Sequence, residues 1–74
     1  MTRQPVQSTN IRSIGYSTET QVLEVEFIRG GTYQFQDVPP ETHRDLMHAA
    51  SIGKFFAMYV KEKFSYAKAQ EGKA

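Results

Sequence analysis

The chain contains no cysteine and no tryptophan, and its 74 residues include only three prolines. The absence of cysteine excludes disulfide bonds, thiolate metal sites and a cysteine nucleophile, so packing must supply the stability of the fold. Long apolar runs are also missing, because no segment approaches the roughly 18 consecutive apolar residues that a membrane-spanning helix needs. We therefore expect a chain without cross-links and without a membrane partner.

The first ten residues lack the apolar core of a signal peptide, because Val6 is the only strongly apolar side chain after Met1. Together with the absence of cysteine, this predicts a cytoplasmic protein. Apolar residues make up 39% of the chain and charged residues 23%, which is typical of a folded protein. The 74 residues suffice for one domain only.

The net charge of +1 hides an asymmetry along the chain. Residues 1–53 hold four arginines against six carboxylates, a net charge of −2, whereas residues 54–74 hold five lysines against two carboxylates, a net charge of +3. A basic segment favours an anionic partner, but cations near the end of a helix also stabilise its negative pole and aid solubility. Both interpretations stay open at this point.

Apolar and polar residues alternate in the first half of the chain, which predicts β-strands. A less regular strand is expected over residues 11–16, a second over 23–27 and a third over 33–35. The segment Arg29-Gly30-Gly31 suits a tight hairpin, because glycine tolerates a positive φ angle. We therefore predict a three-stranded antiparallel β-meander.

Two helices are predicted in the second half. Pro39 and Pro40 end the strands and suit the first turn of a helix over residues 40–50. Ser51 is the expected N-cap of a second helix, whose apolar residues follow at i, i+3, i+4, i+7, i+8 and i+12. These residues are Ile52, Phe55, Phe56, Tyr59, Val60 and Phe64.

The apolar residues of the second helix should cover the sheet, with Phe55 and Phe56 both facing it. The predicted fold class is thus α+β, in the order β-β-β-α-α, with both helices packed on one face. Aromatic side chains on the strands, at Phe27, Tyr33 and Phe35, are interpreted as core, and a base-stacking platform is the alternative.

Residues for catalysis or metal binding are not recognised. His43 and His48 would lie roughly 140° apart on one helix, so they cannot chelate one metal ion. No serine lies in a G-x-S-x-G elbow, and the glycine pair at 30–31 lacks the rest of a phosphate-binding loop. We therefore expect no enzyme, no catalytic residue, no metal and no small-molecule cofactor.

Basic side chains provide the candidate binding residues. Lysines recur every seven residues near the C-terminus and would form a stripe along the second helix if that helix extended far enough. Two arginines from the strand region could add further phosphate contacts. The candidate nucleic-acid-binding residues are Arg12, Arg29, Lys54, Lys61 and Lys68.

A series of short motifs resembles the KTSC domain in order and spacing, over roughly residues 8–66. In that family a central Tyr-x-Tyr is typical, whereas this chain has Phe35 at the second tyrosine position. The motifs are Asn10-Ile11, Ile14-Gly15-Tyr16, Leu23-x-Val25-x-Phe27, Gly30, Tyr33-Gln34-Phe35, Val38-Pro39 and Ala50-Ser51-x-Gly53-x-Phe55-Phe56.

The resemblance implies a domain over residues 8–66, and we expect flexible ends at residues 1–7 and 67–74. The family occurs at the C-terminus of some lysyl-tRNA synthetases and as small bacterial proteins of unknown function, which implies weak RNA or nucleic-acid binding by an accessory module. The alternative is a protein–protein interaction or homo-oligomerisation module, motivated by the two edges of a small sheet. RNA or another protein is thus the expected partner, and the chain is expected to be a monomer or a weak homodimer.

Overall fold

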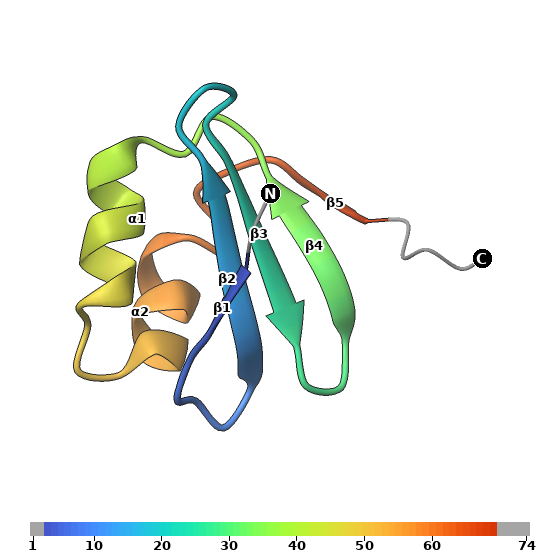
Figure 1. Ribbon diagram of the computed structural model, residues 1–74, viewed down its shortest axis with the longest axis vertical. Helices are drawn as coiled ribbons and strands as arrows, with labels where there is room; N and C mark the ends of the chain where they lie inside the picture. The colour runs from blue at the N-terminus through green and yellow to red at the C-terminus, as the bar shows by residue number, and fades with distance from the viewer. Residues whose placement is uncertain (1–2, 70–74) are drawn as a thin grey trace.

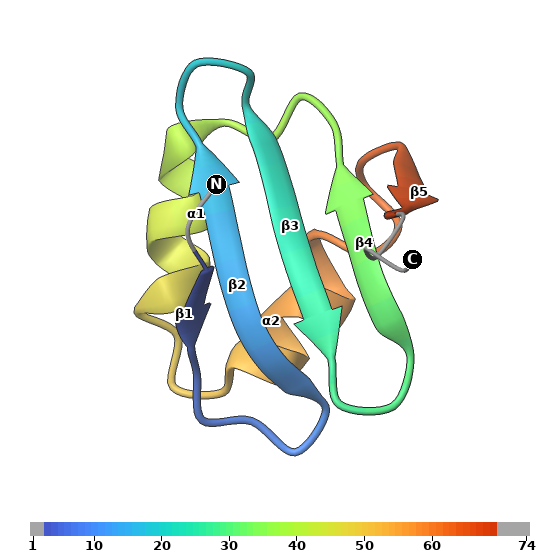
Figure 2. The same ribbon diagram turned by 45° about the vertical axis from the view of Figure 1, so that its right-hand side comes forward.

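The computed structural model describes residues 3–69. Within this range five antiparallel strands form one sheet in the order β1-β2-β3-β4-β5, and two helices cover one face of it (Figures 1 and 2). The elements are β1 (Arg3–Pro5), β2 (Ile11–Ser17), β3 (Val22–Phe27), β4 (Gly31–Phe35), α1 (Pro40–Met47), α2 (Ile52–Tyr59) and β5 (Tyr66–Lys68). The predicted α+β class is confirmed.

The three predicted strands are present as the antiparallel series β2-β3-β4, but the predicted number of strands was wrong, because two further strands lie at the edges of the sheet. β1 pairs with β2 and β5 pairs with β4, each along three residues. Strands this short show no recognisable alternation, and it is the hydrogen bonds to a neighbouring strand that stabilise them. The flexible ends predicted at residues 1–7 and 67–74 stay predictions, and residues 1–2 and 70–74 lie outside the described residues.

A β-bulge near the start of β2 accounts for the irregular first strand. Ile11 pairs with Phe27 and Ser13 with Glu26, so the register shifts between these two pairs. The extra residue returns Ile11 to the same face as Ile14, which three positions of regular strand would have put on the opposite face. Both isoleucines are 1% exposed, so the bulge adds one buried side chain to the core.

Both helices have eight residues, and within residues 3–69 no helix has the length and apolar composition needed to cross a membrane. The expected N-cap is confirmed, since the Ser51 hydroxyl accepts a hydrogen bond of 3.3 Å from the Lys54 amide. The expected extension of α2 to residue 64 was wrong. α2 ends at Tyr59, and the following turn leads the chain back to β4, where the Gln36 amide donates to the Ser65 carbonyl at 2.8 Å.

The core lies between the sheet and the helices. Phe56 is 6% exposed and meets the rings of Phe27 and Phe35 edge on, as predicted. Phe55 is only partly buried, and its ring lies 4.8 Å from that of Tyr59, which is 50% exposed. The two phenylalanines therefore do not share one environment. The buried apolar residues are Ile11, Ile14, Leu23, Val25, Phe35, Val38, Leu46, Phe56 and Val60.

The opposite face of the sheet is polar, and its side chains pair with one another. These pairs explain why two polar residues of this face, Ser13 and Thr32, are buried without loss of their hydrogen bonds. The hydrogen bonds run from Ser13 Oγ to Glu26 Oε1 at 2.8 Å, from Gln34 Nε2 to Glu24 Oε2 at 3.1 Å and from Arg3 Nη1 to Thr32 Oγ1 at 3.2 Å. Open apolar surface is therefore found on the helical side.

Candidate functional site

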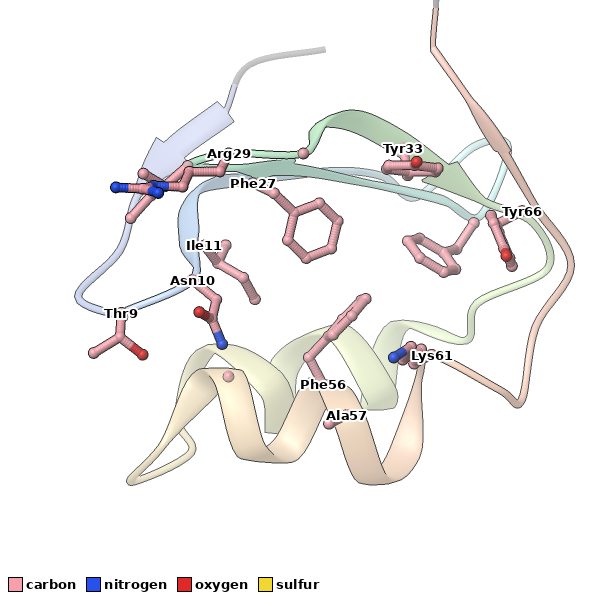
Figure 3. A pocket seen from close by; sticks show the side chains of 14 residues that line it. Thr9, Asn10, Ile11, Phe27, Arg29, Tyr33, Phe56, Ala57, Lys61 and Tyr66 are labelled. Carbon is pink, nitrogen blue, oxygen red and sulfur yellow. The ribbon is translucent and has the colours of Figure 1, made fainter.

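An open groove of about 600 Å³ lies between the sheet and α2 (Figure 3). One wall is formed by residues of β3, β4 and β5, and the other by α2 and the turn after it. Gly53 and Ala57 lie one helical turn apart on α2, and both line the groove together with Phe56. A Cβ on Gly53 would lie 3.2 Å from Ser8 Oγ, so the helix passes close to the connection before β2 at this point.

Five aromatic rings line the groove and form a closed series of contacts. Phe35 and Phe56 are buried, whereas Tyr66 is 58% exposed. The rings thus form core on one side and accessible surface on the other. Phe35 is buried, and Phe27 and Tyr33 are partly buried against the core, as the core interpretation of these strand aromatics predicted. The centroid distances are 5.8 Å for Phe27 and Tyr33, 5.7 Å for Tyr33 and Tyr66, 5.4 Å for Tyr66 and Phe35, 5.3 Å for Phe35 and Phe56, and 5.4 Å for Phe56 and Phe27.

Of the residues that the structure describes, two cations and no carboxylate line the groove. Arg29 comes from the turn between β3 and β4, Lys61 follows α2, and the two lie at opposite ends of the groove in Figure 3. Within residues 3–69 neither of them forms an ion pair. Arg12, the other arginine candidate, lies elsewhere, because its Nε is 3.8 Å from a carboxylate oxygen of Glu26. The groove is therefore suited to an anionic ligand.

The predicted lysine stripe does not exist, because α2 ends before its second member. Lys54 lies in the first turn of α2 and is exposed outside the groove, whereas Lys61 lies beyond the helix and lines the groove. Lys68 belongs to β5, and its Cε lies only 3.0 Å from the position that a Cβ on Gly31 would occupy. The structure therefore places Arg29 and Lys61 at one site, with Lys68 against the neighbouring hairpin.

Asn10 and Tyr66 are groove residues that were not predicted as binding residues from the sequence. Asn10 lies in the connection before β2, and Tyr66 lies in β5, so neither belongs to a periodic pattern. The wall formed by α2 did leave a signal: Gly53 and Ala57, four positions apart, are small residues on one side of an otherwise bulky helix. That spacing could have indicated an opening beside the helix.

A second cluster joins α1 to β2. The ring of His43 stacks on that of Tyr16 with centroids 4.6 Å apart, and the Tyr16 hydroxyl donates a hydrogen bond to the Val38 carbonyl. Burial, and to a lesser extent the Glu41 carboxylate, raise the pKa of the Tyr16 hydroxyl. Burial lowers the pKa of the His43 imidazole. Both groups are therefore neutral near pH 7, and the cluster acts as packing between the helix and the strand.

The lowered pKa of His43 predicts a pH-dependent stability. The unfolded chain binds the proton more readily than the native one, so the free energy of unfolding should fall as the pH drops through about 6.5, the ordinary histidine pKa. Urea denaturation of the wild type and of His43→Gln between pH 7.5 and 5.5 measures this. The fall should be smaller in the variant, and His48→Gln controls for loss of an exposed imidazole. Equal slopes of unfolding free energy against pH for the wild type and His43→Gln would contradict this prediction.

The KTSC domain family matches residues 7–64, which is most of the described chain. The chain belongs to the KTSC domain family. This confirms the resemblance that the sequence motifs indicated. A crystal structure of a KTSC domain protein from Yersinia pestis is similar to this KTSC domain with a TM-score of 0.92 and 43% sequence identity, covering 93% of this chain and 97% of that one. The two proteins therefore share the fold over nearly their whole lengths.

Relatives of this KTSC domain fall into two kinds. An uncharacterized protein from Stutzerimonas stutzeri is 44% identical over 61 residues, which are 82% of this chain and 86% of that protein. A lysine–tRNA ligase from Nostoc punctiforme is 38% identical over 56 residues, which are 76% of this chain but only 10% of the ligase. Because the matched segment is so small a part of the ligase, the similarity does not assign ligase activity to this KTSC domain.

Proposed function

We propose that this KTSC domain is a non-catalytic accessory module that binds single-stranded RNA in the groove between the sheet and α2. The observation that carries the proposal is the composition of the groove. Among residues 3–69, its lining combines five aromatic rings with two cations that form no ion pair, and it includes no carboxylate. Proteins that bind single strands use this combination, because bases stack on aromatic rings and phosphates pair with cations.

The residues of the groove have separate roles in this proposal. The exposed ring of Tyr66 and the partly exposed ring of Tyr33 would stack on bases, and Arg29 and Lys61 would contact phosphates. Lys68, which pairs with Tyr33 across β4 and β5, would add a third phosphate contact beside the groove. Stacking and ion pairing require no cofactor. The relative that is named a lysine–tRNA ligase acts on an RNA, and this association adds support without carrying the argument.

The salt dependence of binding tests the proposal. Three phosphate contacts should produce a slope of about −2 in a plot of log affinity against log salt, at roughly −0.7 per contact for a single strand. Fluorescence anisotropy with labelled single-stranded RNA at several salt concentrations measures this slope. In the variant Arg29→Gln plus Lys61→Gln the slope should shrink to about −0.7, because two of the three contacts are lost.

A matched control removes the same amount of charge elsewhere. Arg12→Gln plus Lys54→Gln changes the net charge equally, but these side chains lie outside the groove, so the slope should stay near that of the wild type. Equal losses in the two double variants would indicate binding by overall charge rather than by the groove. Absence of saturable binding at low salt would refute the proposed function.

The alternative, pairing of sheet edges with another protein or a second copy, has less support. The edge strand β1 ends at Pro5, which has no amide hydrogen to donate, and β5 is three residues long and carries Lys68. Proline, lysine and short length are features that protect sheet edges from pairing. We therefore expect a monomer, and light scattering over a range of concentrations tests this.

A further inference from the structure

The groove has the capacity of a small-molecule site rather than that of a long strand-binding channel. Its volume of about 600 Å³ lies within the range of roughly 300 to 1,000 Å³ that is typical of pockets for small ligands. One base with its sugar and flanking phosphates fits such a space, and Arg29 and Lys61 lie at its opposite ends, where they can pair with phosphates of the bound strand (Figure 3).

The side-chain amide of Asn10 is available for hydrogen bonds to a ligand. The backbone of Asn10 is fixed by two hydrogen bonds. Its backbone N–H donates to Ser8 Oγ at 3.2 Å, and its backbone carbonyl accepts from the backbone N–H of Ile28 at 2.9 Å. Its side chain makes no hydrogen bond within residues 3–69, and Figure 3 shows it pointing toward α2 into the space between the walls. The amide offers an acceptor beside a donor.

An anchored asparagine amide that faces an aromatic site matches the edge of adenine. Its oxygen accepts from the N6 amino group while its nitrogen donates to N7, a bidentate pairing that adenine presents and uracil does not. The remaining surface of the purine is apolar and suits the partly buried ring of Phe27, which lies on the Asn10 side of the groove in Figure 3, whereas Tyr33 and Tyr66 lie at the other end. We propose that the groove holds a single unstacked adenine of the bound strand and that Asn10 reads its edge. This inference rests on the RNA binding proposed above and adds the identity of the base.

The test compares two ligands that stack alike and differ at one acceptor. A labelled hexamer of adenosine and the same hexamer built from 7-deazaadenosine, which lacks the N7 acceptor, are titrated with the wild type and with Asn10→Ala. The wild type should bind the adenosine hexamer about tenfold more tightly than the 7-deazaadenosine hexamer. This affinity ratio lies at the lower end of the discrimination that a bidentate contact provides. In Asn10→Ala the ratio should fall to about one, with the salt slope unchanged.

Gln7→Ala is the matched control, because it removes an amide from the same connection at a position that does not line the groove. It should keep the tenfold ratio. Arg29→Gln plus Lys61→Gln should weaken both hexamers alike and so also keep it. An equal affinity of the wild type for the two hexamers, or an unchanged ratio in Asn10→Ala, would overturn this inference while leaving RNA binding intact.

Two other outcomes identify a different occupant. If no RNA binds to the wild type, the inference and the proposed function fall together. Displacement of the adenosine hexamer by N-acetylphenylalanine amide as readily as by adenosine monophosphate would mean that the groove accepts any aromatic group. The occupant would then be a side chain of a partner protein, and the adenine inference would be refuted.

Discussion

Phe56→Ala should leave this KTSC domain largely unfolded at room temperature. Phe56 is the buried residue of α2, at 6% exposure, and its ring contacts Phe27 and Phe35 from the two central strands that it covers. Truncating a buried phenylalanine costs about 3 to 5 kcal/mol, and a core of this size supplies a total stability of roughly 3 to 5 kcal/mol. Urea denaturation followed by far-UV circular dichroism measures the loss.

Two further variants provide stability losses with which that of Phe56→Ala can be compared. Phe55→Ala should cost only roughly 1 to 2 kcal/mol, because Phe55 is partly buried and part of its area stays in water. Lys61→Ala removes an exposed side chain and should change the stability by about 0.5 kcal/mol or less. If Phe56→Ala kept the stability of the wild type, α2 would not be docked through this ring, and the groove beside it would not exist as described.

Leu46→Ala should have a similarly large effect through the other helix. Leu46 is the buried residue of α1 and is 0% exposed, so α1 is held to the sheet mainly by this side chain. Truncating a buried leucine to alanine costs about 2 to 5 kcal/mol, which again approaches the whole stability of a small domain. We expect a fall in the urea midpoint, or loss of the folding transition.

Arg44→Ala is the matched control on the same helix. The Arg44 side chain is 64% exposed, and its ion pair with Asp45 at 3.5 Å lies in water, where such pairs contribute little. Its effect should stay within about 0.5 kcal/mol. Equal effects of Leu46→Ala and Arg44→Ala would show that α1 contributes little to the core.

The parts of the fold that were predicted correctly are those with a local pattern. The alternation in β3 and β4, the glycine turn between them, the proline start of α1 and the Ser51 cap of α2 all depend on neighbours within a few positions. The errors concern long-range pairing. The apolar spacing from Ile52 to Phe64 continued the helical pattern, but pairing of β5 with β4 required the chain to turn after Tyr59.

The candidate site was predicted only in part for the same reason. Arg29 and Lys61 were recognised by their charge, but the heptad spacing grouped Lys61 with Lys54 and Lys68, which the structure separates. Asn10 belongs to a family motif but to no periodic pattern that marks it as a groove residue, because its place there depends on the bulge of β2 and on the approach of α2. A side chain in an irregular connection acquires its neighbours from the packing of other elements.

The sequence by itself determined the fold class, the three central strands, the two helices, most of the core and the family, because periodicity, capping and motif order act over short stretches. The tertiary structure alone decided how the sheet ends and whether a groove remains. β1 and β5 form only where β2 and β4 offer free hydrogen bonds. Arg29 and Lys61, distant in the chain, share one groove only because α2 docks against the sheet beside the turn between β3 and β4.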